Sequence, residues 1–258
     1  MKLPILKFVY QGLLTGMPLL TYNPITKNNF IAPVEIEQFS TYLNFKLNND
    51  QVNNLNQYIH FYNNNIDIVP IKLLADDDKD NYLSINIYNC TTPIMSQNKE
   101  TITRCEINTY IYDKKNNQYG TMILDYISNT ISMDPINIFK LGNQLDLSLD
   151  KLNNKIKCIG NSEKEKIGIN FDFELLENQK LKLDNSLIDY TDNIYYKNGI
   201  YDKVYYDSSL TNAKILRVNE YNFNFTYRDL NFNQLDSLFY FDNKISFAGC
   251  MWKNLYNI

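Results

Sequence analysis

Glycine is scarce in this sequence and histidine is nearly absent, since the 258 residues include eight Gly and a single His, His60. Phosphate-binding loops are rich in glycine, and no GxGxxG, P-loop, GxSxG or HExxH motif occurs. A serine or cysteine triad would need this one histidine as its base, and zinc sites usually take more than one. The sequence therefore predicts no cofactor and no metal, and we expect His60 to be a structural residue at the edge of the core.

Arginine is rare as well: 3 Arg stand beside 22 Lys and 39 Asn, and the net charge is -4. Nucleic-acid-binding surfaces are typically basic and rich in clustered arginine. The scattered lysines of this acidic chain therefore predict no nucleic-acid partner. High Asn, Ile, Tyr and Lys together with low Arg, Gly, Ala and Pro are typical of an AT-rich genome.

Long hydrophobic runs and paired cysteines are also missing. No stretch reaches the ~18 apolar residues that a transmembrane helix needs. The apolar N-terminal segment is interrupted by Pro4 and Lys7, and no small-residue cleavage site follows it. The four cysteines form no CxxC pair, so we expect free, mostly buried thiols in a reducing compartment. These absences predict a cytoplasmic protein without a membrane partner.

What the chain does contain is β-strand patterning, over a length suited to a single domain that spans residues 1–258. Apolar and polar residues alternate in several segments, and 49–58 has helical spacing with Asp50 as a candidate cap. The alternating segments are 82–90, 101–112, 119–128, 167–175 and 213–227. We expect a β-rich α+β fold with six to nine strands in a mostly antiparallel sheet or barrel, and one or two short helices.

Segments 101–112 and 119–128 flank a turn of Lys, Asn and Gln, which predicts a β-hairpin. Successive side chains of a strand point to opposite faces. One face of 101–112 then carries core residues such as Cys105 and Ile107, and the other is polar. The polar residues are Arg104, Glu106, Asn108, Tyr110 and Tyr112. With the turn at 114–117, we expect Tyr112 opposite Tyr119 and Glu106 opposite Asp125.

Two carboxylates held close together beside an arginine have pKa values pushed apart, and such pairs serve as acid and base. The hypothesis is that Arg104 binds a substrate carboxylate and that Glu106 or Asp125 moves protons. The alternative is a solvent-exposed face on which the same charges form ordinary cross-strand pairs. A one-residue slip of register would separate Glu106 from Asp125.

Lys140 is the second candidate for chemistry, because it follows Pro135 and the apolar residues Ile136, Ile138 and Phe139. Burial disfavours the charged form of a lysine, and a neutral amine can attack a carbonyl to form a Schiff base. The alternative is a surface lysine whose apolar stem packs while its charge stays in water.

The order of these features resembles the acetoacetate decarboxylase family. A short helix and a following Pro precede two alternating strands, a hairpin and a turn that ends in Phe139-Lys140-Leu141-Gly142. A late Asn-Ala-Lys-Ile word at 212–215 then leads into an apolar C-terminal stretch. The resemblance covers roughly residues 49–252. It implies a cone-shaped β-barrel around an internal cavity, and a Schiff-base lysine in a motif of the form P-K-K-L-G or P-K-x-L.

The sequence departs from this family at three places. Phe139 precedes Lys140 where the family can have two lysines, so Lys140 matches either the nucleophile or the lysine that lowers its pKa. No Arg occurs before Arg104, where the family has a catalytic arginine, and Glu100 is the glutamate available before the hairpin. Desolvation by Ile138 and Phe139 then has to replace the missing cation.

The resemblance implies a lyase that acts on a small carbonyl or carboxylic acid, such as a keto acid, through a Schiff base. Lys140 is then the nucleophile, Glu106 or Asp125 the proton carrier, and Arg104 the substrate-binding group. Tyr110 and Asn108 complete the substrate-binding face. One alternative is a non-catalytic barrel that binds an apolar ligand or a protein partner, since the C-terminal half is rich in Tyr and Phe. A structural or assembly protein is another, and a homo-oligomer stays open.

Overall fold

The computed structural model describes part of the chain. The described residues are 31–36, 40–91, 102–128, 142–144, 148–150, 155–162, 167–174, 184, 187, 190, 193–196, 201–206, 213–216, 222–232, 234–241 and 245–249.

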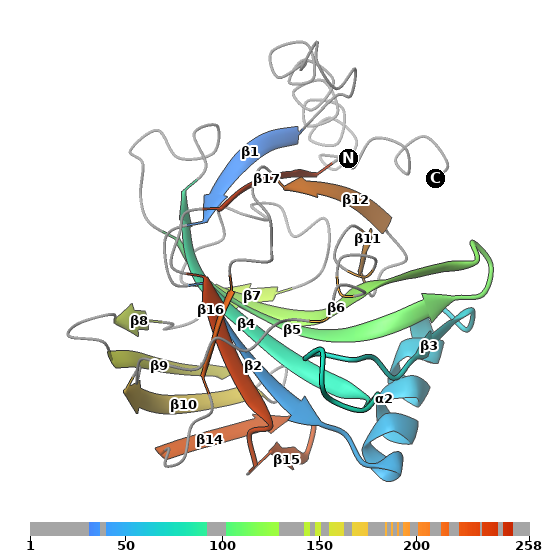
Figure 1. Ribbon diagram of the computed structural model, residues 1–258, viewed down its shortest axis with the longest axis horizontal. Coiled ribbons are helices and arrows are strands. Elements are labelled where there is room, and N and C mark those ends of the chain that lie inside the picture. Colours follow the sequence, from blue (N-terminus) through green and yellow to red (C-terminus); the bar gives the residue numbers. More distant parts are fainter. Residues whose placement is uncertain are drawn as a thin grey trace, which may run out of the picture.

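Strands dominate this part of the chain, and they form a large and a small sheet (Figure 1). The large sheet has the order β13-β16-β2-β4-β1-β17-β12-β11-β6-β5-β3, with β7 beside β6 and a further pairing of β4 with β5. Its strands are β1 (Ile31–Ile36), β2 (Ser40–Lys46), β3 (Ile66–Ile68), β4 (Tyr82–Thr91), β5 (Ile102–Asp113), β6 (Gln118–Ser128), β7 (Gly142–Gln144), β11 (Asn193–Tyr196), β12 (Tyr201–Tyr206), β13 (Ala213–Leu216), β16 (Ser237–Phe241) and β17 (Ile245–Gly249). The small sheet has the order β15-β14-β10-β9-β8. Its strands are β8 (Ser148–Asp150), β9 (Lys155–Ser162), β10 (Ile167–Glu174), β14 (Asn222–Tyr227) and β15 (Leu230–Phe232).

Most pairings are antiparallel, and the parallel ones join β6 to β11 and to β7. The prediction of a strand-rich, mostly antiparallel fold is confirmed. The strands are more numerous than the predicted six to nine, because one predicted segment holds two and strands such as β1, β2, β11 and β12 lie outside the predicted segments. Segment 213–227 contains β13 and β14, which belong to different sheets. Strand β3 ends at Ile68, two residues before Pro70, which cannot donate a backbone hydrogen bond. The closed barrel stays a prediction.

The helix α2 (Asn49–Tyr62) begins with a capping box at Asn48. The Asn48 side chain accepts a hydrogen bond from the Gln51 backbone N–H, and the Gln51 side chain accepts one from the Asn48 N–H, both at 2.9 Å. These bonds satisfy two donors that a helix start leaves without partners. The predicted helix is confirmed and extends past residue 58. The cap is Asn48 rather than Asp50, because the reciprocal bonds form with Gln51 and place Asp50 in the first turn.

The hairpin of β5 and β6 has its turn at residues 114–117, as predicted, and Tyr112 pairs with Tyr119. Asn117 adopts a positive φ of 52°, which Asn tolerates better than most residues. Farther from the turn, the register shifts between Ile107 and Asn108, because β6 holds Leu124 as one extra residue. This is a β-bulge, and it moves every following partner by one position.

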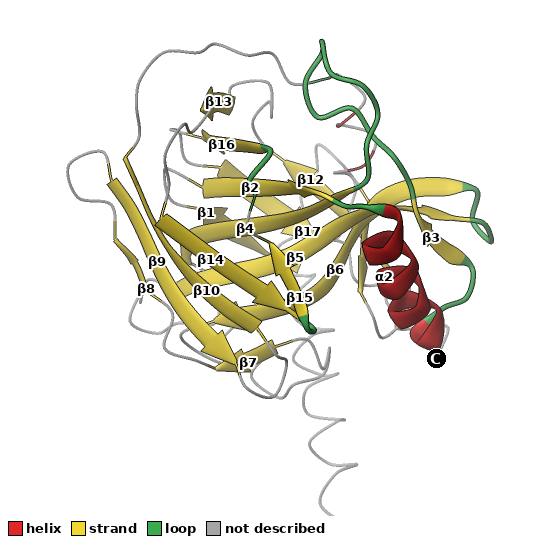
Figure 2. Cartoon of the chain, turned by 90° about the horizontal axis from the view of Figure 1, so that it is seen from below, coloured by secondary structure: helices red, strands yellow, loops and turns green. Residues whose placement is uncertain are grey.

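The apolar face of the large sheet packs against the small sheet, which crosses it, and against α2 (Figure 2). Phe45 of β2 stacks on Phe225 of β14 with ring centroids 5.4 Å apart, and Phe225 stacks on Phe232 of β15 at 5.1 Å. Both sheets and α2 contribute to the same buried cluster, so one apolar core holds the three together. Phe225, Tyr227, Phe232 and Phe239 of the C-terminal half are all buried.

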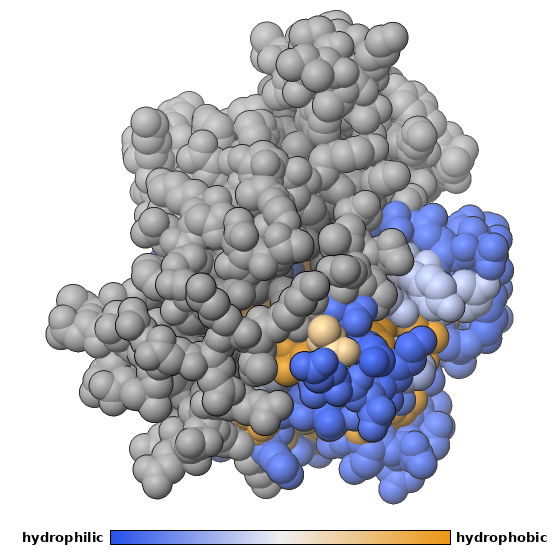
Figure 3. Space-filling model, in the orientation of Figure 1, coloured by the Kyte–Doolittle hydropathy of each residue, from blue (hydrophilic) through white to orange (hydrophobic). Residues whose placement is uncertain are grey.

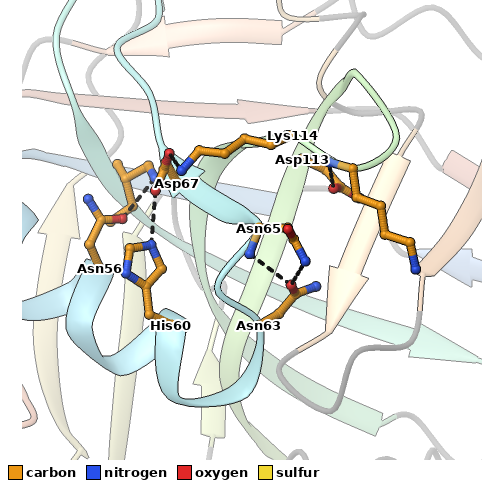
Figure 4. A network of polar contacts seen from close by, with 9 residues as sticks. Asn56, His60, Asn63, Asn65, Asp67, Asp113 and Lys114 are labelled. Atoms are coloured by element: carbon orange, nitrogen blue, oxygen red, sulfur yellow. Dashed lines mark hydrogen bonds and ion pairs between the residues drawn. The ribbon is translucent and has the colours of Figure 1, made fainter.

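Polar groups at the surface join α2, β3 and the hairpin turn (Figure 4). Asp67 of β3 lies 2.9 Å from Nε2 of His60 and 2.5 Å from Nζ of Lys114. Burial alone would raise the pKa of Asp67, but the hydrogen bonds from Lys114 and His60 outweigh it and lower that pKa. The expectation that His60 sits at the edge of the core is wrong, since its side chain is exposed and paired with Asp67.

The surface of the described residues is mainly hydrophilic in the space-filling view, with hydrophobic residues visible in small areas between polar ones (Figure 3). Cys90, Cys105 and Cys158 are buried and form no disulfide bond, as predicted, and Cys250 lies outside the described residues. Within the described ranges, no helix is both long and apolar enough to cross a membrane.

Candidate functional site

The second face of the large sheet is polar and nevertheless buried. Strands β2, β4, β5 and β16 carry buried polar residues at alternate positions on this face, which we call the polar face. They are Asn44, Tyr82, Ser84, Asn86, Tyr88, Arg104, Glu106, Asn108, Tyr110 and Ser237. Buried polar groups are unfavourable unless they are hydrogen-bonded, so a face of this kind needs either an internal network or a ligand. The possibility that the face of Arg104 is solvent-exposed is therefore wrong.

Cross-strand register places these side chains in rows. Ser84 lies opposite Asn108, Asn86 opposite Glu106, and Tyr88 opposite Arg104, all between β4 and β5. On the other side of β4, Asn44 of β2 lies opposite Ser84. Because directly opposed side chains share a face, each row brings polar groups of neighbouring strands within reach of one another.

One end of the polar face is charged. Nε of Arg104 lies 2.7 Å from Oε1 of Glu106, and both side chains are about nine-tenths buried. The Tyr88 hydroxyl donates a hydrogen bond to the same carboxylate oxygen, also at 2.7 Å. Burial raises the pKa of Tyr88 well above its ordinary value, although Arg104 lowers it in part. Tyr88 therefore stays protonated and holds Glu106 as a hydrogen-bond acceptor.

The other end of the polar face is neutral. The Ser84 hydroxyl donates a 2.6 Å hydrogen bond to Oδ1 of Asn44, and the Asn44 amide contacts the hydroxyl of Ser237 at 3.3 Å. Ser84 Oγ also lies 3.5 Å from the Tyr110 hydroxyl, at the limit of a hydrogen bond. Burial raises the pKa of Tyr110 to about 12, and the contact with Ser84 lowers it in part. This end therefore offers neutral donors and acceptors at pH 7.

The neutral end carries a side-chain acceptor that is unsatisfied. Among the residues that the structure describes, Oδ1 of Asn108 is buried and has no hydrogen-bond partner. Leaving a buried acceptor without a partner is costly, and such atoms are rare in native proteins. The atom is therefore a candidate acceptor for a donor from a bound group.

The predicted site residues are only partly brought together. Arg104, Glu106, Asn108 and Tyr110 share the polar face, as their alternation in β5 predicts. The predicted pairing of Glu106 with Asp125 is wrong. Glu106 pairs with Tyr126, and Asp125 pairs with Ile107 on the apolar face, because the bulge at Leu124 shifts the register by one residue.

Asp125 is fully buried among aromatic groups between the two sheets and α2. Its Oδ2 accepts a 2.7 Å hydrogen bond from the Tyr227 hydroxyl and one of 3.4 Å from Tyr58 of α2. Arg228 lies 3.7 Å from the same oxygen, and its guanidinium stacks 3.4 Å above the Tyr58 ring. Asp125 thus joins both sheets and the helix. Because it lies on the apolar face, it cannot act as a proton carrier on the polar face.

Lys140 lies outside the described residues. The nearest described strand that follows it is β7, whose first residue, Gly142, pairs in register with Tyr126. Tyr126 in turn pairs with Glu106. Gly142, two residues after Lys140 in the sequence, therefore lies on the cross-strand row that contains Glu106.

Sequence reasoning missed the contribution of β4. The alternation of Ser84, Asn86 and Tyr88 with the apolar residues Leu83, Ile85 and Ile87 is visible in the sequence. It predicts a strand with one polar face, but the pairing with β5 is what places that face beside Arg104 and Glu106. In the part of the chain that the structure describes, no group of three or more His, Cys, Asp or Glu residues is arranged to hold a metal ion.

Comparison with known proteins gives structural similarity at very low sequence identity. No family model matches the sequence, and no curated protein matches it. An acetoacetate decarboxylase from Legionella pneumophila subsp. pneumophila str. Philadelphia 1 superposes with a TM-score of 0.46 at 10% identity, over 86% of each chain.

Two further solved structures are similar to this chain. An acetoacetate decarboxylase-like enzyme from Sphingomonas wittichii RW1 has a TM-score of 0.48 at 6% identity and covers 85% of this chain and 91% of its own. The enduracididine biosynthesis enzyme MppR, complexed with pyruvate, has a TM-score of 0.47 at 5% identity, over 88% of this chain and 92% of its own. The resemblance predicted from the sequence is thus confirmed as a divergent structural similarity to acetoacetate decarboxylase and enzymes like it.

Proposed function

We propose that the polar face binds a small keto acid, and that Lys140 acts on its carbonyl group as a Schiff-base nucleophile. The observation that carries the proposal is the buried group of Arg104, Glu106 and Tyr88, in which one carboxylate faces two donors at 2.7 Å. A guanidinium has five N–H donors in a planar fork, so Arg104 can hold a second carboxylate beside Glu106.

The position of β7 supports the assignment of Lys140. Gly142 lies on the cross-strand row of Glu106, and two residues of extended chain span at most about 7 Å. The lysine amine would attack the ketone carbon of the substrate, and loss of water would leave a C=N bond. In a β-keto acid, the bond to the carboxylate then breaks, its electron pair moves toward the imine nitrogen, and CO2 departs.

A proton must then reach the carbon that lost CO2, and hydrolysis of the imine returns the amine and a neutral ketone. Glu106 is the carboxylate on the polar face suited to relay this proton from water, with Tyr88 as its fixed hydrogen-bond donor. Asp125 takes no part in this proposal, because it points to the apolar face.

We also infer that the large sheet closes into the barrel predicted from the sequence. The support is that successive strand pairings lead from β4 through β1, β17, β12, β11, β6 and β5 back to β4. Closure of this ring would place the polar face on the inside and shield its charges from water.

Imine trapping tests the proposal. The protein is incubated with a panel of α-keto and β-keto acids, reduced with borohydride, and its mass is measured with the modified residue mapped. We expect an adduct on Lys140 that disappears in Lys140→Ala and persists in Lys115→Ala, a matched change at an exposed lysine of the hairpin turn. If folded protein gives no lysine adduct with any acid, Schiff-base chemistry is excluded. Copurifying ligand without turnover would then indicate a binding protein.

A further inference from the structure

The neutral end of the polar face carries two buried atoms that its own network leaves unsatisfied. Within the described part of the chain, neither Oδ1 of Asn108 nor the hydroxyl of Tyr82 has a hydrogen-bond partner. Asn108 is 5% exposed and Tyr82 is fully buried. Tyr82 precedes Ser84 by two residues in β4, so it shares the face on which Ser84 lies opposite Asn108.

The chemistry of these atoms selects the ligand group that they can accept. A carboxamide oxygen is purely an acceptor, so Asn108 needs an O–H or N–H donor from its partner. A tyrosine hydroxyl both donates and accepts, and that of Tyr82 lies under the influence of the Asp236 and Asp80 carboxylates. Burial raises the pKa of Tyr82, which keeps its hydroxyl neutral. A hydroxyl or amide group fits this position better than a second carboxylate, which offers no donor.

The strand spacing fixes how far this group lies from the charged end. Along β5, Asn108 lies two residues, or about 7 Å, from Glu106 and four residues, or about 13 Å, from Arg104. Nε of Arg104 lies 2.7 Å from Oε1 of Glu106, so the guanidinium reaches toward the nearer of these two positions. The side chain opposite Asn108 on β6 is Ile123, which is buried and apolar. The methylene groups that join the two polar ends of a ligand could pack against this apolar side chain.

We propose that the polar face binds an acid with a second polar end: a carboxylate at Arg104 and, about five single bonds away, a hydroxyl or amide donor at Asn108. This inference rests on the proposed function in that Arg104 holds the carboxylate, but it does not require Lys140 or a ketone. The ligand, including the keto acid of the proposed function, thus carries a hydroxyl or amide group at its far end rather than an apolar tail.

Titration calorimetry with two probes tests the inference, with hexanoate and 6-hydroxyhexanoate as the matched pair. The second probe should bind the wild-type protein about tenfold more tightly, which is the usual worth of a hydrogen bond to a buried group that is otherwise unsatisfied. Neither probe has a ketone, so the comparison is independent of imine formation.

Two variants locate the effect. In Asn108→Leu, both probes should bind with the affinity of hexanoate, whereas Arg104→Met should lose both. Ligand-free Asn108→Leu should melt no lower than the wild type, because an apolar side chain replaces an unsatisfied acceptor. A lower melting temperature would assign Asn108 a structural role and overturn the inference.

The outcomes separate this inference from the proposed function. Equal binding of the two probes to the wild type would overturn the inference, since water then satisfies Asn108, and would leave carboxylate binding at Arg104 intact. Binding of neither probe would overturn both the carboxylate site and this inference. Imine trapping would still test the Schiff-base role of Lys140 independently.

Discussion

The two faces of the large sheet differ in kind although both are buried. Along β5, Cys105, Ile107 and Ile111 face the small sheet and α2, whereas Glu106 and Asn108 face the other way. The apolar face follows the usual logic of a core, in which burial of apolar area drives packing. Burial of the polar face does not stabilise the protein in this way, because its carboxylate and amide groups lose their hydration when they are buried.

This difference indicates where stability and function reside. The apolar face holds the sheets together through shape and area. The polar face keeps groups that a purely structural core would replace with apolar ones, since replacing a buried ion pair with well-packed apolar residues is often neutral or stabilising. We therefore expect changes on the first face to unfold the protein and balanced changes on the second face to remove ligand binding.

The largest effect should come from breaking the apolar face at Phe225. Its ring stacks on Phe45 of the large sheet and on Phe232 of the small sheet, so Phe225→Ala should lower the free energy of unfolding by about 3–5 kcal/mol. Urea denaturation measures this change, with the exposed neighbour Asn224→Ala as the control. A loss below about 1 kcal/mol would show that the two sheets do not depend on this contact.

An intermediate effect is expected at the ion pair of the polar face. Arg104→Met leaves Glu106 buried without its cation and should cost about 3 kcal/mol, because an uncompensated buried charge is strongly destabilising. The double variant Arg104→Met with Glu106→Leu should recover most of this loss and still fail to bind hexanoate. Denaturation and calorimetry on the same samples give both quantities. A double variant as unstable as the single one would contradict a functional reason for this pair.

The smallest effect belongs to the surface network of Asp67, which serves as a reference outside both faces. Asp67→Asn should lower stability by less than about 1 kcal/mol at pH 7, since exposed ion pairs contribute little. The folded protein lowers the pKa of Asp67, so this stabilisation is present above the unfolded pKa of about 3.9 and is lost as the pH falls through the folded value. Denaturation curves of the variant and the wild type should therefore differ slightly at pH 7 and coincide in acid. A difference that persists in acid would rule out the carboxylate as its cause.

Much of the fold near the site follows from local pattern. Alternation alone predicts β5 and the face shared by Arg104, Glu106 and Asn108, and the turn composition predicts the pairing of Tyr112 with Tyr119. These features depend on the chain period of two residues, which a sequence displays directly.

The rest depends on contacts that no local pattern contains. Leu124 is an apolar residue in an apolar run, and nothing in its neighbourhood indicates that it is the extra residue of a bulge. The burial of the polar face depends on which strands pair, and the same alternating pattern describes a face in water. The sequence also does not distinguish Asn48 from Asp50 as the cap of α2, because both residue types are good caps. The reciprocal hydrogen bonds between Asn48 and Gln51 decide the position.

The bulge in β6 also has a consequence for how this chain tolerates changes in length. Leu124 is the residue without a partner on β5, whereas Ile123 pairs with Asn108 and Asp125 with Ile107. A deletion of Leu124 would therefore shorten the chain and leave every other cross-strand pair of the hairpin in place. Loss of a residue farther along β6 would turn over the stretch between that residue and the bulge, and would exchange its buried apolar and polar side chains. The hairpin thus has a place at which one residue can be removed with both faces of the sheet preserved.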